Sequence, residues 1–323
     1  MRLRMFSMVI LLFVNVGVSQ TKDIIPKNII LMIGDGMGVS HLTAAHTYKG
    51  RLELEKFRYV GLLLTHAYGK DYVIDSGAAA TALSTGVKTF DGAIAVGPDS
   101  SMAETVLERA KKKGKKTGIV IVCSITHATP ACFVAHVPNR NMQLEIAEQI
   151  TDGESDLYLG SGWGWFVPSE LGGRRKDGKN LIQTMTSRGY TYVSTDSAYR
   201  VLDLKRVQKL LGLFAENHVP NSQSRKPSLR EMTKTALDIL SRERNGFFLM
   251  VEGSQIDWAA HDNNSDQILV ETADFDDTIG EVARFAEKDG ETLVIVTADH
   301  ETGGYTLNGG SLAERKVVGA FTT

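Results

Sequence analysis

Cysteine is scarce in this sequence, since Cys123 and Cys132 are the only two among 323 residues. A scaffold held together by disulfide bonds is therefore excluded, and the two thiols either form one bridge or stay free and buried. Neither sign of charge is in excess, because 36 basic and 38 acidic residues give a formal net charge of −2. The basic surface that nucleic-acid binding requires is not predicted, so we expect a small or locally recognised ligand.

Long apolar runs are also rare, and the one at the N-terminus covers residues 5–18. It follows a short basic segment and precedes Ser19 and other polar residues, an order that is typical of a secretory signal peptide. A membrane anchor is the alternative, but the run is short for a bilayer span and Asn15 interrupts it. We expect a signal peptide at 1–19, a mature domain at 20–323, no stable membrane anchor, and a periplasmic or secreted location.

Short β-branched runs alternate with longer helical patterns along most of the chain. Strands are predicted at residues 28–33, 118–123, 156–160, 247–251 and 293–297, and helices at residues 101–113, 229–242 and 267–287. This alternation is typical of a parallel sheet with helices on both faces. We therefore predict an α/β protein, a three-layer α/β/α sandwich around a mostly parallel central sheet. Residues 161–227 have weak periodicity and indicate a peripheral insertion.

Side chains that bind metals follow four of the predicted strands. They are Asp35, His127, Thr129, Glu252, Asp257, His261, Asp299 and His300. Because ligands gather at the carboxyl ends of parallel strands, we expect a metal cluster there. Mixed Asp and His ligands favour zinc, whereas the oxygen-only set of Asp35, Thr129 and Glu252 favours magnesium. Taken alone, Asp257 and His261 fit a hydrogen bond on a helix surface better than a metal site.

Ser76 directly precedes a run of small residues that favour a helix. A helix N-terminus stabilises negative charge, so Ser76 is a candidate nucleophile, although an ordinary N-cap serine has the same pattern. Arg140 follows Pro138 at a predicted helix start, and its guanidinium could bind two phosphate oxygens or lie on the surface. The glycines at 34–38 do not have the spacing of a dinucleotide-binding motif. Ser76 is not in a Gly-x-Ser-x-Gly motif, so an acyl hydrolase is not supported.

Six motifs together resemble the alkaline phosphatase family in order and spacing, most closely its compact bacterial members. They are Ile33-Gly-Asp-Gly-Met-Gly38, Asp75-Ser-Gly-Ala-Ala-Ala-Thr-Ala82, His127-Ala-Thr129, Arg140, Glu252-Gly-Ser-Gln-Ile-Asp-Trp-Ala-Ala-His261 and Thr297-Ala-Asp-His300. The resemblance spans nearly the whole mature chain.

The resemblance implies a metal-dependent phosphomonoesterase in which Ser76 becomes phosphorylated and Arg140 binds the phosphate. It also implies two Zn²⁺ ions and one Mg²⁺ ion. The implied ligands are Asp35, Asp299 and His300 for the first zinc, Asp257 and His261 for the second, and Asp35, Thr129 and Glu252 for magnesium. His127 and Trp258 resemble positions near the metals at which family members vary, and Asp75 is a further secondary residue of the nucleophile motif.

One departure from the family concerns the second zinc, which takes a further histidine near the C-terminus. This sequence ends at Thr323 before such a motif, so we expect a domain whose C-terminal end is missing and whose second zinc is weakly held. We expect broad specificity for small phosphomonoester substrates, and the family implies a homodimer. The alternatives are a phosphodiesterase or sulfatase of the same superfamily, or a non-catalytic protein that binds phosphate or metal.

Overall fold

The computed structural model describes residues 25–69, 72–153 and 155–323. The predicted signal peptide at 1–19 lies outside the described residues. Within those ranges, no helix is long and apolar enough to cross a membrane. Cys123 and Cys132 are both buried and free, so the possible disulfide bond does not form.

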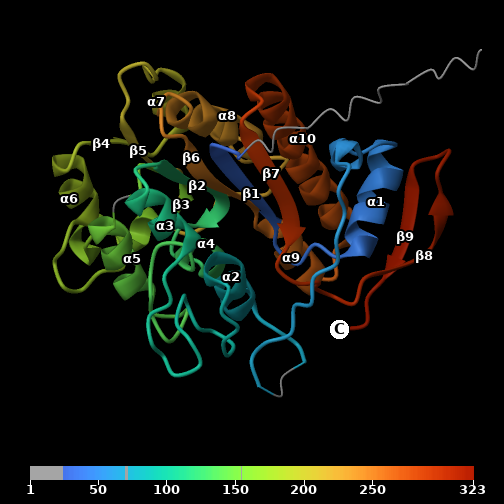
Figure 1. Cartoon of the computed structure of the whole chain (residues 1–323). Coiled ribbons are helices and arrows are strands. Elements are labelled where there is room, and N and C mark those ends of the chain that lie inside the picture. Colours follow the sequence, from blue (N-terminus) through green and yellow to red (C-terminus); the bar gives the residue numbers. More distant parts are fainter. Residues whose placement is uncertain (1–24, 70–71, 154) are drawn as a thin grey trace, which may run out of the picture.

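Seven parallel strands form the central sheet, in the order β4-β5-β3-β2-β6-β1-β7 (Figure 1). The strands are β1 Asn28–Gly34, β2 Lys116–Ser124, β3 Leu157–Ser161, β4 Tyr190–Val193, β5 Lys209–Leu213, β6 Phe247–Gly253 and β7 Thr292–Ala298. Each of the five strands predicted from the sequence corresponds to one of these. β4 and β5 were not predicted, and both come from residues 161–227, so this segment widens the sheet at one edge.

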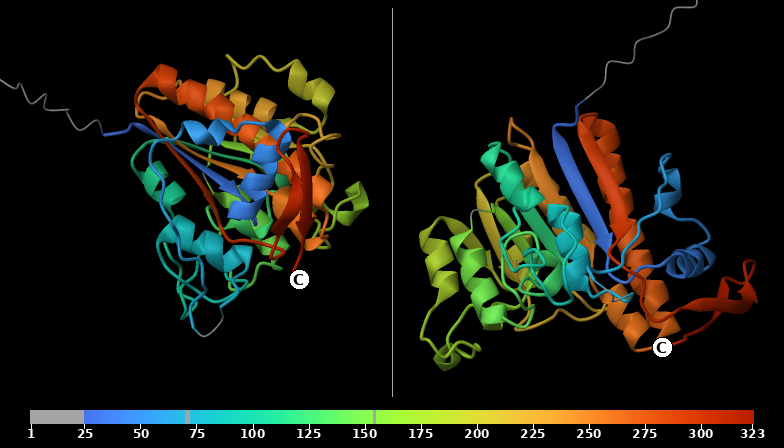
Figure 2. Two further views of the ribbon diagram at one scale, coloured as in Figure 1. Left: turned by 90° about the vertical axis from the view of Figure 1, so that its right-hand side faces the viewer. Right: turned by 60° about the horizontal axis from the view of Figure 1, so that its bottom comes forward.

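The helices pack on both faces of the sheet (Figures 1 and 2). They are α1 Val39–Lys49, α2 Ser76–Thr85, α3 Val106–Lys112, α4 Ala128–Ala131, α5 Gln143–Asp152, α6 Leu181–Ser187, α7 Asp196–Arg200, α8 Leu229–Leu240, α9 Gln255–His261 and α10 Ser265–Asp289, with 3-10 turns η1 Glu53–Lys56, η2 Trp163–Trp165 and η3 Ser169–Leu171. The predicted three-layer α/β/α sandwich is confirmed. The helix predicted at 101–113 begins only at Val106, because the Thr105 hydroxyl caps it.

Alternate residues of β1 pack into two different cores. Leu31 and Ile33 face the core that contains residues of α2, α3 and α5, whereas Ile30 and Met32 face the core that contains residues of α8 and α10. Successive side chains of a strand point to opposite faces, so a strand covered on both faces is apolar throughout. This explains why β1 was recognisable as an uninterrupted apolar run.

Two surfaces leave apolar side chains exposed. Residues 57–69 and 72–75, between η1 and α2, have no regular structure, and Tyr59, Leu62 and Leu64 are 97%, 101% and 79% exposed. We call residues 57–69 the apolar arm. At the β7 edge of the sheet, Leu293 and Ile295 are 42% and 43% exposed. The remaining strands, β8 Thr306–Ser311 and β9 Lys316–Ala320, form an antiparallel hairpin that packs beside α1 (Figure 1).

Candidate active site

The carboxyl ends of three adjacent strands bring acidic residues together. β1 lies between β6 and β7, and Ile33 is in register with both Glu252 and Thr297. Asp35 therefore follows β1 at the level where Glu252 stands one residue before the end of β6 and where Asp299 follows β7. Asp35, Asp299 and His300 have ligand atoms within 4.8 Å of one another, and no other such group of three occurs in the described ranges.

The geometry of this group leaves ligand atoms free. The Asp299 Oδ1 atom accepts hydrogen bonds from the backbone N–H groups of Gly36 (3.1 Å) and His300 (2.9 Å). Its Oδ2 atom lies 3.4 Å from His300 Nε2 and has no hydrogen-bond donor in the described chain. The side-chain atoms Asp35 Oδ2, Thr129 Oγ1 and Glu252 Oε1 are likewise buried without a partner. Four unpartnered oxygens converge on this edge, where buried polar atoms are normally satisfied.

A positive charge would stabilise the ionised forms of the buried carboxylates in this cluster. Asp35, Glu252 and Asp299 are at most 1% exposed. Burial, followed by repulsion from neighbouring carboxylates, raises the pKa of Asp35 well above its ordinary value and that of Glu252 to about 8. Burial is also the main cause of the raised pKa of Asp299. Such a cluster ionises readily only beside a cation, so the residues present fit metal ions.

Ser76 is the first residue of α2, and its hydroxyl is not used for capping. The helix cap is the Asp75 carboxylate, which accepts hydrogen bonds from the backbone N–H groups of Ala78 and Gly92, both at 2.9 Å. The alternative reading of Ser76 as an ordinary N-cap is therefore wrong. The Ser76 Oγ atom instead lies 3.5 Å from Asp35 Oδ1 and 3.3 Å from His300 Nε2, beside the cluster.

Arg140 lies in the turn before α5 rather than at a helix start. Its Nη1 atom donates to Asp75 Oδ2 at 2.8 Å, and its Nη2 atom lies 3.3 Å from His127 Nε2. Burial, followed by the nearby Arg140 charge, lowers the pKa of His127 to about 3. A neutral imidazole can accept the guanidinium hydrogen bond, so Asp75 and His127 together orient Arg140.

Asp257 and His261 lie one turn apart on α9, with His261 Nε2 3.5 Å from Asp257 Oδ1. Asp257 is buried, whereas the His261 side chain is 70% exposed. Gly36 packs tightly against Asp257, because a Cβ atom on Gly36 would lie 2.8 Å from Asp257 Oδ1. The predicted second pair is thus assembled next to the Asp35 loop, with its histidine facing solvent.

The structure adds two residues that sequence reasoning missed. The Thr302 hydroxyl donates to Asp257 Oδ1 and lies 3.1 Å from His300 Nδ1, so it links the two groups of candidate ligands. Its position two residues after His300 was the available signal. His218, from the segment 161–227, packs against Trp258 with ring centroids 4.6 Å apart. No local pattern marked it.

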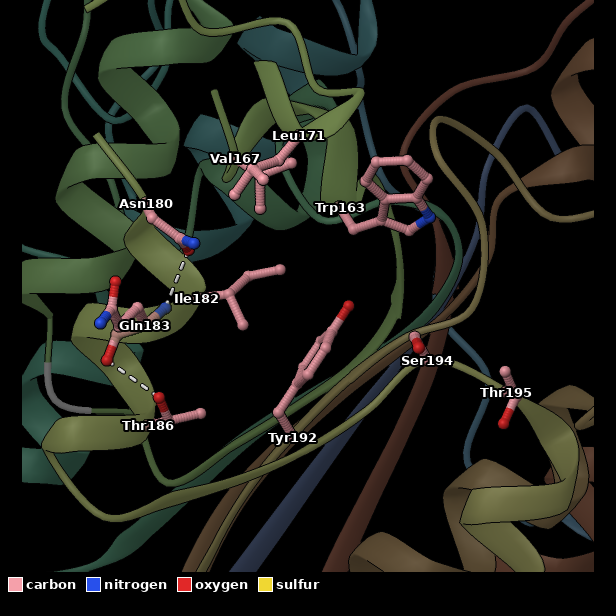
Figure 3. Close-up of a pocket in the computed structure, with 10 residues that line it drawn as sticks. All are labelled: Trp163, Val167, Leu171, Asn180, Ile182, Gln183, Thr186, Tyr192, Ser194 and Thr195. Carbon is pink, nitrogen blue, oxygen red and sulfur yellow. Dashed lines mark hydrogen bonds between the residues drawn. The ribbon is translucent and has the colours of Figure 1, made fainter. Parts of the chain in front are cut away.

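A cavity lies apart from these residues, between α6 and the end of β4 (Figure 3). Its volume is about 630 Å³, and it is lined mainly by residues of the segment 163–195. Figure 3 shows the Tyr192 ring projecting toward Trp163 and Ile182. None of the candidate site residues lines this cavity, so it is separate from the candidate active site.

The chain is similar to known proteins over most of its length. The family model for alkaline phosphatase matches residues 26–320. Alkaline phosphatase 4 of Bacillus subtilis is 42% identical over 299 residues, covering 87% of this chain and 62% of the relative. The Escherichia coli alkaline phosphatase is 37% identical, covering 85% of this chain and 70% of the relative. This chain thus spans less than two thirds of the Bacillus protein.

Solved structures give the same result. The alkaline phosphatase from the Antarctic bacterium TAB5 superposes with a TM-score of 0.84 at 37% identity, covering 92% of this chain and 87% of that one. A variant of the TAB5 protein is described with Mg bound in its M3 site. The Thermus thermophilus alkaline phosphatase superposes with a TM-score of 0.83 at 36% identity, covering 90% and 63% of the two chains.

Proposed function

Because this chain belongs to the alkaline phosphatase family, we propose that it hydrolyses phosphate monoesters with Ser76 as the nucleophile. The observation that carries the proposal is the position of the Ser76 hydroxyl. It is buried at the N-terminus of α2, free of any capping duty, and within 3.5 Å of both Asp35 and His300.

The candidate ligands would hold three metal ions. Asp35, Asp299 and His300 would hold one Zn²⁺, Asp257 and His261 a second, and Asp35, Thr129 and Glu252 one Mg²⁺. When bound, these ions neutralise the buried carboxylates and stabilise the charge that develops during phosphoryl transfer. The four unpartnered oxygens support this assignment.

The residues of the chain have separate tasks in this reaction. The Ser76 hydroxyl gives up its proton as its oxygen forms a bond to phosphorus, and the leaving oxygen takes up a proton as its bond to phosphorus breaks, so that an alcohol is released. The N–H groups at the start of α2 stabilise the negative charge. Arg140 donates to two phosphate oxygens in the orientation that Asp75 and His127 give it. Attack by water then releases phosphate and restores the Ser76 hydroxyl.

The arrangement favours monoesters over the other substrates of the superfamily. A guanidinium that binds two oxygens at once matches a phosphate dianion better than a diester or a sulfate ester, both of which carry a single negative charge. No substrate-reading segment is evident beside the motifs, so we propose broad specificity for small phosphomonoesters. Export to the periplasm or beyond remains a prediction from residues 1–19.

We further propose that the protein forms a homodimer through the apolar arm. The TAB5 and Escherichia coli relatives support the family assignment, which implies a homodimer. The apolar arm would supply the surface through which the two copies bind. A monomer would leave the side chains of Tyr59, Leu62 and Leu64 in water, and large apolar side chains exposed close together in the sequence are typical of an interface.

The decisive experiment measures hydrolysis of an aryl phosphate, a bis-aryl phosphate and an aryl sulfate, with Zn²⁺ and Mg²⁺ added. We expect the monoester to be turned over fastest and Ser76→Ala to reduce turnover to the buffer background. Metal content and inorganic phosphate binding are measured on the same samples. Full metal content and phosphate binding without turnover by the unaltered chain would instead identify a non-catalytic binder.

A further inference from the structure

One imidazole of the segment 161–227 reaches the candidate site. The His218 Nδ1 atom accepts a hydrogen bond from the backbone N–H of Ser124, at the end of β2, at 3.1 Å. This contact assigns the lone pair to Nδ1 and, in the neutral ring, the proton to Nε2. Burial, followed by the Arg174 charge, lowers the pKa of His218, which is consistent with a neutral ring.

Three rings meet at this point, and we call His127, His218 and Trp258 the ring triad. The Trp258 ring lies 4.6 Å from His218 at 70° and 5.8 Å from His127 at 80°, both edge-on contacts. The centroids of His127 and His218 are 6.0 Å apart. Edge-to-face packing at these distances fixes ring orientation as well as position.

The ring triad joins the segment 161–227 to two parts of the active site. Trp258 directly follows Asp257 on α9, and His127 orients Arg140 and precedes Thr129 by two residues. A second contact holds the same three segments, because the Gln255 Nε2 atom donates to Val122 O on β2 and to Val219 O beside His218.

The backbone of the segment 161–227 packs closely against Ser124. A Cβ atom on Gly162 would lie 2.0 Å from Ser124 Oγ, so the segment 161–227 sits directly on the end of β2. Ser124 itself is fully buried. Loss of the His218 acceptor would leave the backbone N–H of Ser124 buried and unpaired, at a free-energy cost comparable to that of a lost hydrogen bond.

We propose that His218 is a positioning residue for phosphate ester hydrolysis. It fixes the Trp258 ring and the end of β2, and through them the placement of Asp257, His127 and Arg140. The proposal rests on the proposed function, since it assigns these residues to the reaction. Small displacements of groups that support a reacting centre are costly to the rate, although the displaced residue never contacts the substrate.

Two substitutions of His218 test the proposal. His218→Asn retains an acceptor near the position of Nδ1, whereas His218→Leu retains bulk without an acceptor. We expect His218→Leu to lower kcat/KM for an aryl phosphate by about tenfold or more. We expect His218→Asn to lose less, because it retains an acceptor for the Ser124 N–H although it removes the ring that packs against Trp258. Thermal unfolding and metal content establish that both variants are folded and loaded.

A fluorescence measurement makes the test independent of turnover. The protein has three tryptophans, so Trp163→Phe and Trp165→Phe together leave Trp258 as the only reporter. In this background, His218→Leu should increase acrylamide quenching of Trp258, and His218→Asn should increase it less. Unchanged quenching in His218→Leu, or an equal loss of kcat/KM in both variants, would overturn the proposal. Failure of the proposed function would remove turnover from every sample but leave the quenching pattern intact.

Discussion

Asp75 links the helix that carries Ser76, the proposed nucleophile, to the arginine proposed to bind phosphate, so its replacement has two separable effects. Its Oδ1 atom accepts the N–H groups of Ala78 and Gly92, and its Oδ2 atom pairs with Arg140. Asp75→Ala removes all three contacts. Asp75→Asn retains one acceptor oxygen for the two N–H groups and removes the charge that holds Arg140.

The local geometry sets how much each lost contact lowers the free energy of unfolding. A lost N-cap costs about 1 kcal/mol. An unpaired Gly92 N–H costs about 1 kcal/mol more, because it is partly buried. The ion pair adds at most about 1 kcal/mol, since the Arg140 and Asp75 side chains are 27% and 25% exposed and solvent screens them. We therefore expect Asp75→Ala to cost about 3 kcal/mol and Asp75→Asn about 1 kcal/mol in the free energy of unfolding.

Urea unfolding of the metal-loaded protein, followed by far-ultraviolet circular dichroism, measures these free energies. Initial rates with an aryl phosphate show whether Arg140 has lost its orientation, and we expect KM to rise in both variants. Equal destabilisation by alanine and asparagine would refute the assignment of Asp75 as the cap. An unchanged KM in both would refute its role in orienting Arg140.

The pH dependence gives a further check on Asp75. Burial alone would raise its pKa, but the N–H groups of Ala78 and Gly92 and the Arg140 charge outweigh burial and lower it. A lowered pKa in the folded state means that the ionised group contributes stability above its unfolded value of about 3.9. That contribution is lost as the pH falls through the folded value. The stability difference between the unaltered chain and Asp75→Asn should therefore narrow below about pH 4.

Two other predictions concern the metal cluster and the apolar arm. The raised pKa values of Asp35, Glu252 and Asp299 mean that the folded chain, once treated with a chelator, retains protons that the unfolded chain has lost. Its Tm should therefore fall as the pH rises from about 5 toward 8, and added Zn²⁺ and Mg²⁺ should remove this trend. A Tm that rises over this range would contradict the assignment of raised pKa values to the cluster. Replacing Leu62 and Leu64 by Glu should convert a dimer into a monomer without unfolding it, as sedimentation velocity would show, and an unchanged sedimentation coefficient would place the interface elsewhere.

The sequence was sufficient for those parts of the fold that have a strong local signal. β1 was predicted to within one residue, because an apolar β-branched run covered on both faces has no competing interpretation. β4 and β5 were missed, because Tyr190–Val193 is only four residues long and Lys209–Leu213 contains a glycine. Such short segments become strands through pairing with their neighbours, which periodicity does not register.

The candidate site likewise contains residues that the sequence predicted and residues that it did not. The spacing of motifs nominated Asp35, Asp299 and His300, which the fold brings within 4.8 Å of one another. The sequence could not show that Asp75 rather than Ser76 caps α2, since both residue types favour that position. Nor could it place His218, whose contact with Ser124 joins residues 94 positions apart through tertiary packing alone.

The open side of β7 has a consequence for the behaviour of the protein in solution. β7 is the outermost strand of the described sheet, and its edge is flanked by the exposed Leu293 and Ile295. An uncovered edge of this kind is a template on which another copy can add a strand, and head-to-tail addition of that kind has no built-in stopping point. For the chain that ends at Thr323, colloidal stability should therefore depend on protein concentration separately from any closed dimer. A charged residue at position 293 or 295 would protect the edge while leaving the two buried cores untouched.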